Sequence, residues 1–431
     1  MLDCILIFIG KCISYASALF HLGNGSTWPG HIALRINPFF IKNLITKNKL
    51  KIIIITGTNG KTTTASMLTH ILTENGYKVF LNNSGANLLN GIASSIIITA
   101  NLQGKLKSDY AIFEIDENAL SAALLQMTPD FLVLLDLFRD QLDRYGEIWT
   151  IANRWENAIK KLPPQTCIIS NADDPKIAFI GVNSNKKTRY YGLLEQEQDQ
   201  EHHSKCPQYA SDSLYCPQCG KKLNYHIHYY SHLGDYYCGS CEFKRPSLNV
   251  HHTEYPLVGM YNKYNALAAT LTALEIGLNE PMIHKANQSF TPVFGRQEIL
   301  EVSGKHVQLF LAKNPTSFNE AYQTIVTLGA KFLCISLNDR TPDGTDVSWI
   351  WDFDLPNLGN FSHIFLTGDR VYDLGLRLKY EDSQHFTLYT NPKEAIHEAL
   401  SMLPNNETLF VLPTYSAMLD IREIIIGKRI Q

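Results

Sequence analysis

Residues 51–63 read KIIIITGTNGKTT, and this stretch decides the fold of the first half of the chain. The β-branched run from Lys51 to Ile55 predicts a buried strand. A glycine-containing turn spans Gly57 to Lys61, and apolar spacing from Thr62 to Asn75 predicts a helix that ends at Gly76. This order of strand, turn and helix aims backbone N–H groups and the helix dipole at one point. Such a point binds phosphate.

The turn also carries the side chains that a phosphate-binding loop uses. Its residues are Gly57, Thr58, Asn59, Gly60, Lys61, Thr62 and Thr63. We expect Lys61 to reach the outer phosphates of ATP and the Thr62 hydroxyl to bind Mg²⁺. The loop is shorter than the common P-loop, because Ile55 occupies the position of the earlier glycine. A tight turn without a ligand is the alternative, but it would not require glycine, lysine and threonine together.

Strands alternate with helices along most of the chain. Further strands are predicted at Tyr77–Leu81, Tyr110–Ile115, Phe131–Leu135 and Cys167–Ser170, and a helix at Tyr261–Leu274. A second series runs through Val307, Phe332–Leu337, His363–Thr367 and Thr408–Leu412. Such alternation predicts parallel sheets with helices on both faces. We therefore predict an α/β protein with a central parallel-sheet ATPase domain at 46–300 and a C-terminal Rossmann-like α/β domain at 301–431.

Composition limits the class of protein. The 431 residues are 45% hydrophobic and 18% charged, which is ordinary for a globular chain with two or three cores. The net charge of -3 predicts no general attraction to nucleic acid or to anionic membranes.

Residues 1–45 are expected to form an apolar helix and a connector. Polar residues interrupt the run from Leu2 to Leu22, so it is a poor membrane span, and Asp3 stands where a signal peptide would be basic. The Gly-Asn-Gly segment at Gly23 to Gly25, followed by Trp28-Pro29-Gly30, is predicted to end this helix. We expect a cytoplasmic protein whose first helix packs on the body of the chain. Contact between this helix and the inner face of the membrane stays open.

The composition at residues 200–250 differs from the rest and suggests an insertion. Two Cys-x-x-Cys pairs lie there, separated by eighteen residues: Cys216, Cys219, Cys238 and Cys241. This spacing can present four thiolates to Zn²⁺, and a closed four-sulfur shell predicts a structural zinc ribbon. Nearby aromatic residues would also suit nucleic acid, but small ribbons inside enzymes are more often structural. Cys206 lies nearby without an assigned role.

With further motifs, the shortened loop resembles the Mur ligase superfamily, whose members use ATP to activate a carboxylate as an acyl phosphate and join it to an amine. Glu114, at the end of the third strand, matches the family's Mg²⁺-binding glutamate. Asn262 matches the first asparagine of a Gly-x-x-Asn-x-x-Asn-x-x-Ala-Ala pattern that begins at Gly259, and in the family it lies near the nucleotide. Arg296, followed by Glu298, matches an arginine that approaches the ATP phosphates. The resemblance thus implies catalytic roles for Lys61, Glu114 and Arg296.

The chain departs from the superfamily in two places. Only about fifty residues precede the first strand, whereas muramyl ligases carry a complete N-terminal domain for a nucleotide sugar. Residues Asp140–Asp143 read Asp-Gln-Leu-Asp, where the family often has a histidine that helps to hold a second Mg²⁺. Glutamine is a weaker Mg²⁺ ligand than a charged group, so the number of magnesium ions stays open. Asn171–Pro175 matches a segment that these central domains often carry.

A cluster of aspartates lies in the C-terminal half. Trp349-Ile350-Trp351 precedes Asp352 and places large apolar rings beside its carboxylate. Such surroundings suit an interface hot spot or an oriented carboxylate. A solvated turn is the alternative, as is usual for Asp-Gly segments such as Asp343–Asp346.

These features together resemble one family of the superfamily, the synthetase subunits of lipid II isoglutaminyl synthases. The resemblance implies that ATP activates the D-glutamate α-carboxylate of lipid II at the membrane surface and that ammonia converts it to D-isoglutamine. The ammonia would come from a GatD-like glutamine amidotransferase in a heterodimer. In the family, the aspartate matched by Asp352 orients the partner's catalytic histidine, and Asp346 and Asp354 are weaker candidates. An external ammonia source fits the sequence, because none of its nine cysteines lies in a Gly-x-Cys-x-Gly turn.

Two alternatives remain open from the sequence. One is a Mur-like amino-acid ligase such as a folylpolyglutamate-type synthase, although the four-cysteine insertion and short N-terminus argue against it. The other is a non-catalytic nucleotide-binding zinc scaffold protein.

Overall fold

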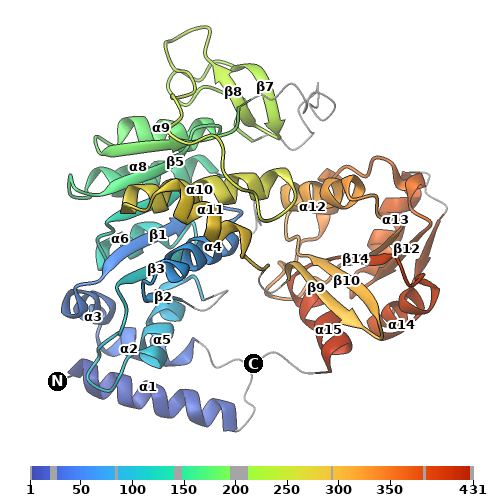
Figure 1. The fold of residues 1–431 in the computed structure, drawn as a ribbon, viewed down its shortest axis with the longest axis horizontal. Helices are drawn as coiled ribbons and strands as arrows, with labels where there is room; N and C mark the ends of the chain where they lie inside the picture. Colours follow the sequence, from blue (N-terminus) through green and yellow to red (C-terminus); the bar gives the residue numbers. More distant parts are fainter. Residues whose placement is uncertain are drawn as a thin grey trace.

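A computed structural model describes residues 2–19, 27–82, 86–139, 148–194, 212–292, 295–381 and 385–427. Two six-stranded sheets each form the centre of a helix-covered layer structure, and a two-stranded hairpin lies at one end of the first (Figure 1). The predicted α/β class is therefore confirmed. In the described part of the chain, every helix is too short or too polar to cross a membrane.

The first sheet is parallel throughout, with the strand order β2-β3-β1-β4-β5-β6. Its strands are β1 (Lys51–Thr56), β2 (Val79–Leu81), β3 (Tyr110–Ile115), β4 (Phe131–Leu134), β5 (Cys167–Asn171) and β6 (Lys187–Tyr191). The five strands predicted here all exist, with ends that move by at most two residues.

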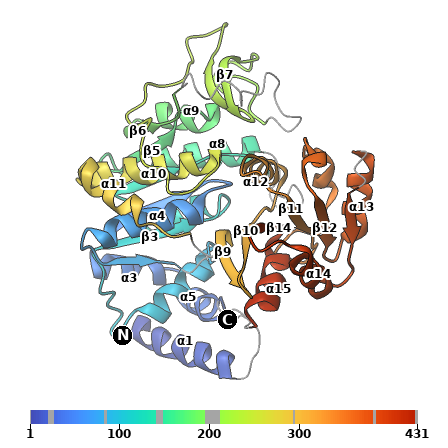
Figure 2. The same cartoon turned by 45° about the vertical axis from the view of Figure 1, so that its right-hand side comes forward.

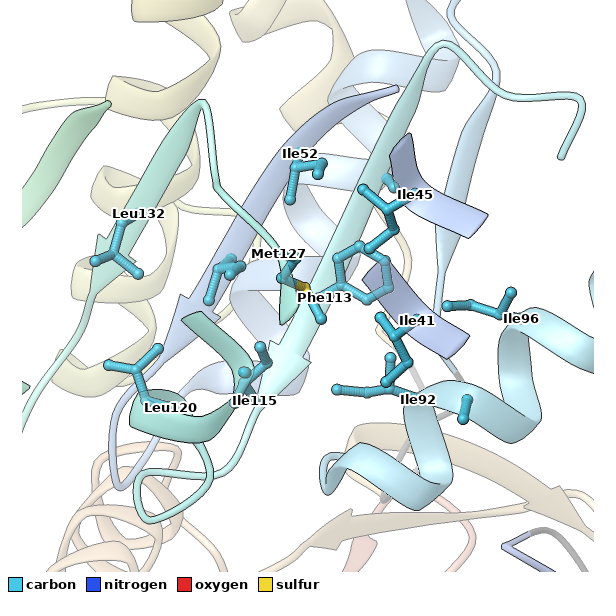
Figure 3. Packing of buried hydrophobic residues seen from close by; sticks show 14 of the residues in the cluster. Ile41, Ile45, Ile52, Ile92, Ile96, Phe113, Ile115, Leu120, Met127 and Leu132 are labelled. Carbon is cyan, nitrogen blue, oxygen red and sulfur yellow. The ribbon is translucent and has the colours of Figure 1, made fainter. Parts of the chain in front are cut away.

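Both faces of this sheet are buried, which explains its continuous apolar strands. Ile53 and Ile55 of β1 pack under α4 (Lys61–Glu74), α10 (Met260–Ile276) and α11 (Glu280–Gln288). Ile52 and Ile54 face the opposite side, which α5 (Leu89–Thr99), α6 (Leu120–Gln126), α8 (Ile148–Lys160) and α9 (Pro175–Asn183) cover. Figure 3 shows this second core, where Phe113 of β3 lies beside Ile41 and Ile45 of α3 (Phe40–Asn48).

The N-terminal region differs from the prediction for residues 1–45. It contains three helices, α1 (Leu2–Leu19), α2 (Trp28–Ile36) and α3 (Phe40–Asn48), rather than one helix and a connector. Trp28-Pro29-Gly30 begins α2 instead of ending α1, because proline is well tolerated in the first turn of a helix. Gly30 lets α2 approach α5 closely: its N–H donates to Ser94 Oγ at 2.8 Å, and a Cβ there would lie 1.9 Å from the carbonyl oxygen of Asn90.

The cysteine-containing insertion folds as an antiparallel hairpin of β7 (Asn224–Tyr230) and β8 (Leu233–Tyr237). It packs beside α9, where Phe243 meets Phe179 at a ring-centroid distance of 5.7 Å. Figures 1 and 2 both place it at the β6 end of the central sheet, far from α1.

The second sheet has the strand order β13-β12-β11-β14-β10-β9. Its strands are β9 (Arg296–Val302), β10 (Lys305–Phe310), β11 (Phe332–Ser336), β12 (His363–Thr367), β13 (Phe386–Leu388) and β14 (Thr408–Pro413). Only β9 runs antiparallel to its neighbour, at one edge. One face packs on α12 (Pro315–Thr327), α13 (Val371–Tyr380) and the 3-10 turns η2 (Ser348–Asp352) and η3 (Leu358–Asn360). The other packs on α14 (Pro392–Met402) and α15 (Tyr415–Ile426).

The two sheets meet through α10 and α12, which contact each other (Figures 1 and 2). The contact places the loop after β1 opposite the start of α12. A cleft forms between the two domains at this point.

Candidate active site

The loop from Gly57 to Lys61 joins β1 to α4. Backbone conformation and close packing explain why two of its positions are glycine. Gly60 is the N-cap of α4 with φ 81°, and a Cβ there would lie 2.1 Å from Asn265 Oδ1. Gly57 has φ 150°, and a Cβ there would lie 2.8 Å from Leu135 Cβ. Positive φ is accessible mainly to glycine. The loop therefore keeps a shape that directs N–H groups at the start of a helix outward.

A cleft of about 390 Å³ opens above this loop, with walls from both domains. Its lining includes every expected loop residue except Gly57, together with Glu114, Asn262 and Arg296. Lys313, Thr316, Ser317 and Glu320 line it from the C-terminal side. Residues predicted from four distant parts of the sequence thus share one cavity.

Lys61 is buried at the floor of the cleft. Its ammonium donates to the backbone oxygens of Gly57 and Thr58 and to the Glu117 carboxylate, which lies 3.0 Å away. Glu117 was not predicted from the sequence. The signal for it was the density of acidic residues at the end of β3, where Glu114 is the next-to-last residue of the strand and Asp116 and Glu117 follow the strand directly.

Thr62, Glu114 and Arg296 converge beside the lysine. The Thr62 hydroxyl donates to Glu114 Oε1 at 2.8 Å, and Arg296 Nη2 approaches the same hydroxyl at 3.5 Å. Burial lowers the pKa of Arg296, although the nearby Glu114 carboxylate opposes this shift. A hydroxyl and a carboxylate oxygen are the ligands that Mg²⁺ prefers, so this pair fits a magnesium ion beside bound phosphates.

Asn262 and Asn265 connect α10 to the loop and helix α4. Asn265 Nδ2 donates to Asn262 Oδ1 at 3.1 Å, and its own Oδ1 accepts from Thr64 Oγ1 at 3.2 Å. From the other domain, Asn314 Nδ2 donates to Asn59 Oδ1 at 3.2 Å. The loop is therefore held from both sides of the cleft.

Two buried carboxyl groups near the cleft were also missed by sequence reasoning. Asp136 follows β4, and its Oδ1 accepts the N–H of Asn59 at 2.8 Å. Burial raises the pKa of Asp136 to about 8. Glu320 lies on α12 and lines the cleft, and burial raises its pKa to about 8 as well. An acidic residue directly after a buried strand was the available signal for Asp136, whereas Glu320 gave none.

The aspartates near the tryptophans lie apart from the cleft. Asp352 is exposed at the end of η2 and is not among the cleft residues. Trp351 beside it is 48% exposed and lies over Arg377, whose guanidinium carbon is 5.6 Å from the ring centroid. Asp346 instead accepts the N–H of Ser348 at 2.8 Å, and Asp354 is half-buried. Asp140–Asp143 and Cys206 fall outside the described residues.

The four predicted cysteines do meet. Their sulfur atoms all lie within 4.8 Å of one another, with 3.6 Å between Cys216 and Cys241 and 3.5 Å between Cys219 and Cys238. Tetrahedral zinc with Zn–S bonds of 2.3 Å needs sulfur atoms about 3.8 Å apart. The donor set therefore fits one Zn²⁺, with all four positions filled by protein.

The fold and the cleft define an ATP-dependent ligase of the Mur ligase type. Residues 55–273 match the Mur ligase middle domain, and residues 311–418 match the MurT ligase C-terminal domain. The fold is similar to a pseudomurein peptide ligase type C from Methanothermus fervidus, with a TM-score of 0.67 and 24% identity over 89% of this chain and 80% of that one. A Mycobacterium tuberculosis folylpolyglutamate synthase complexed with ADP and AMPPCP shares the fold with a TM-score of 0.58 and 16% identity, over 91% of this chain and 95% of that one.

Within this class, the chain belongs to the MurT family. It is 33% identical to the MurT subunit of the glutamine-hydrolysing lipid II isoglutaminyl synthase of Streptococcus pneumoniae (strain ATCC BAA-255 / R6), over 96% of this chain and 95% of that subunit. It is 34% identical to the corresponding subunit of Staphylococcus aureus (strain COL), over 82% of this chain and 83% of that subunit. The family suspected from the motifs is confirmed.

We expect the stability of the protein to depend on the proton of Glu320. The folded state binds this proton up to pH about 8, whereas the unfolded chain releases it near the ordinary value of 4.5. Stability from this group is therefore fully present below pH 4.5 and is lost as the pH rises toward 8. Glu320→Gln removes the titration, so its melting temperature relative to wild type should rise between pH 5 and pH 8.

The measurement is thermal unfolding without nucleotide at several pH values. Glu301→Gln, at an exposed position on β9, is the matched control and should show no such trend. A Glu320→Gln difference that stays constant with pH would contradict the assignment.

Proposed function

We propose that this chain is a synthetase subunit that uses ATP to activate the D-glutamate α-carboxylate of lipid II, which ammonia then converts to D-isoglutamine. One observation carries the proposal: Lys61, Thr62, Glu114 and Arg296 share a cleft in a chain that is similar over nearly its full length to lipid II isoglutaminyl synthase subunits. We assign ATP binding to residues 46–300, with a zinc ribbon within 200–250, and contact with a partner subunit to residues 301–431.

The chemistry follows from the poor reactivity of a carboxylate toward amines. A carboxylate oxygen attacks the γ-phosphorus of ATP, ADP leaves, and an acyl phosphate forms. Ammonia then attacks the acyl carbon, phosphate leaves with the electrons of the C–O bond, and the nitrogen loses a proton. The new amide therefore costs one ATP.

The residues of the cleft fit the first step. Lys61 and Arg296 can stabilise negative charge on the oxygens of the transferring phosphoryl group, and Asn262 lines the wall near the nucleotide. Thr62 and Glu114 would hold Mg²⁺, which neutralises phosphate charge when bound. Positioning two reactants in one closed cleft supplies much of the remaining rate enhancement.

Lys61→Ala should reduce ATP-dependent amidation of lipid II by about 100-fold or more, because one preorganised charge at the phosphoryl group is lost. The assay follows amide formation by mass spectrometry, with ATP, Mg²⁺ and either ammonium or free amino acids. Lys187→Ala, whose side chain is 54% exposed, is the matched control and should retain wild-type activity.

The outcome also separates the alternatives. Turnover with amino acids but never with ammonium would indicate a folylpolyglutamate-type ligase instead. A Lys61→Ala variant that supports normal growth would favour a non-catalytic zinc scaffold.

We infer that the ammonia comes from a GatD-like glutaminase subunit in a heterodimer. The relatives are named as subunits of glutamine-hydrolysing enzymes, whereas this sequence has no cysteine in a nucleophile turn. Asp352 presents an exposed carboxylate on the C-terminal domain, and the half-exposed ring of Trp351 is its neighbour in the chain. Such a pair suits a partner's active site, where Asp352 would orient a catalytic histidine.

Asp352→Ala should abolish most glutamine-dependent activity of the complex and leave activity with free ammonium largely intact, because only the ammonia supply depends on this carboxylate. The measurement is the ratio of the two rates in the co-purified complex. Asp346→Asn is the control, since its carboxylate already accepts the N–H of Ser348. Equal loss of both activities would remove Asp352 from this role.

We also propose that α1 rests on the inner face of the membrane, where a lipid substrate lies. Ile5, Phe8 and Tyr15 are 49%, 57% and 73% exposed, and Trp28 of α2 is 62% exposed. The spacing of the three α1 residues places them along one side of the helix. Such an apolar side, on a protein with net charge -3, suits shallow insertion rather than electrostatic attachment.

Full-length protein should therefore float with zwitterionic lipid vesicles, and added salt should change the bound fraction little. The double variant Ile5→Ser with Phe8→Ser should lose most binding. Leu125→Ser, at a 75% exposed position on α6, is the control. Binding that survives the double variant would contradict a role for α1.

A further inference from the structure

The cysteine hairpin is anchored to the segment that follows β5. Tyr236 is fully buried, and its hydroxyl donates to the carbonyl oxygen of Ala172 at 3.1 Å. The N–H of Gly234 donates to the carbonyl oxygen of Asp173 at 3.0 Å, and the Arg245 guanidinium pairs with the Asp173 carboxylate at 2.6 Å. The tip half of the hairpin therefore packs into the central domain, whereas Asn224, His226 and Tyr237 at its other end are exposed.

The tip of the hairpin reaches further, to the end of β4. His232 is fully buried, and its Nε2 lies 3.3 Å from Oδ2 of the equally buried Asp174. The same Oδ2 accepts the N–H of Leu137 at 2.9 Å. The other oxygen of Asp174 caps α9 by accepting the N–H groups of Lys176 and Ile177. One carboxylate thus ties the hairpin to the segment from Asp136 to Phe138.

Aromatic packing at the same place reinforces this tie. The rings of His232 and Tyr230 lie 4.5 and 5.8 Å from the ring of Phe138. Tyr230 also lines the cleft. The ribbon therefore supplies part of the wall of the nucleotide site itself.

The segment held by the hairpin is the segment that holds the phosphate-binding loop. Phe138 donates its N–H to Thr58 Oγ1 at 3.0 Å, and this hydroxyl donates to the Phe138 carbonyl at 3.2 Å. Asp136 accepts the N–H of Thr58 at its carbonyl and the N–H of Asn59 at its carboxyl. A continuous chain of contacts therefore runs from the ribbon to the loop.

We propose that the four-cysteine ribbon is a positioning element of the nucleotide site, in which Tyr230 and His232 hold residues 136–138 against the phosphate-binding loop, so that zinc binding and ATP binding reinforce each other. The inference rests on the proposed ATP and zinc binding and goes beyond them. Bound zinc restrains the position of the hairpin. The tip of the hairpin then holds residues 136–138 in place, and these residues restrain the phosphate-binding loop. Because linkage is reciprocal, bound nucleotide must raise the affinity for zinc by the same factor by which bound zinc raises the affinity for nucleotide.

His232→Ala removes the tie to Asp174 and should weaken binding of a non-hydrolysable ATP analogue with Mg²⁺ by about tenfold, while the protein keeps one zinc per chain. His232→Gln can still donate to Asp174 and should restore most of the affinity. His226→Ala is the matched control, because His226 is exposed on the same hairpin and stacks on Tyr237. Calorimetric titration gives the affinity, and metal analysis gives the zinc content.

A second measurement does not depend on His232→Ala, so a misfolded variant at that position would not leave the question open. Wild-type protein is brought to equilibrium with a chelator of known zinc affinity and a colorimetric zinc indicator, with and without the ATP analogue and saturating Mg²⁺. The zinc affinity should rise several-fold when the analogue is bound, and it should not change in Lys61→Ala, which cannot grip the phosphates.

The outcomes separate the two levels of the proposal. Protein that binds the analogue and carries zinc, but shows equal zinc affinity with and without the analogue and an unchanged analogue affinity in His232→Ala, would overturn the coupling alone. Protein that carries no zinc overturns the coupling and the zinc site but leaves the ligase function standing. Protein that never binds the analogue overturns the proposed function as well.

Discussion

The structure depends on one constraint: a phosphate-binding loop must leave its N–H groups free for the ligand, so its shape has to be held from outside. Here the end of β4 does most of this. The carbonyl and carboxyl of Asp136 accept the N–H groups of Thr58 and Asn59, and Phe138 exchanges two hydrogen bonds with the Thr58 side chain. On the opposite side, Asn265 fills the space that the missing side chain of Gly60 leaves. Every neighbouring element is therefore coupled to the loop through a few polar contacts.

These polar contacts lie in the protein interior, away from water, so each polar group needs a hydrogen-bond partner within the protein. A buried polar group without a partner is costly, and a buried carboxylate is more so. Asp174 meets this requirement with three backbone N–H groups and His232, and nearby charges and hydrogen bonds lower its pKa despite burial. Asp136 and Glu320 have fewer compensating partners, and burial raises the pKa of both to about 8. At Asp136, the nearby Lys61 ammonium and the N–H of Asn59 oppose this shift in pKa but do not outweigh burial.

The sequence allowed the regular elements and the principal site to be predicted, because both follow local rules. The β-branched run at β1 and the motif at Gly57–Thr63 fixed a strand, a turn and a helix, and the αβ alternation fixed the sheet class. Glu114, Asn262 and Arg296 were placed through a family pattern rather than through physics. The start of α2 at Trp28 was missed because the same proline and glycine can end one helix or begin another. The sequence carried a signal for Glu117 and Asp136 as acidic residues near strand ends. Their contacts and the pairing of His232 with Asp174 could not be predicted, since each depends on which distant segments pack together.

Arg296 is the first residue of β9, so its backbone belongs to the second sheet, while its guanidinium lies at Thr62 of α4, which covers the first sheet. A hinge motion that swung the second sheet outward would carry this positive charge away from the loop as a rigid lever. Closure of the two domains would then bring the Arg296 charge to the phosphates in the same motion. The open form would hydrolyse ATP slowly, because the Arg296 guanidinium that phosphoryl transfer needs reaches the site only when the two domains close.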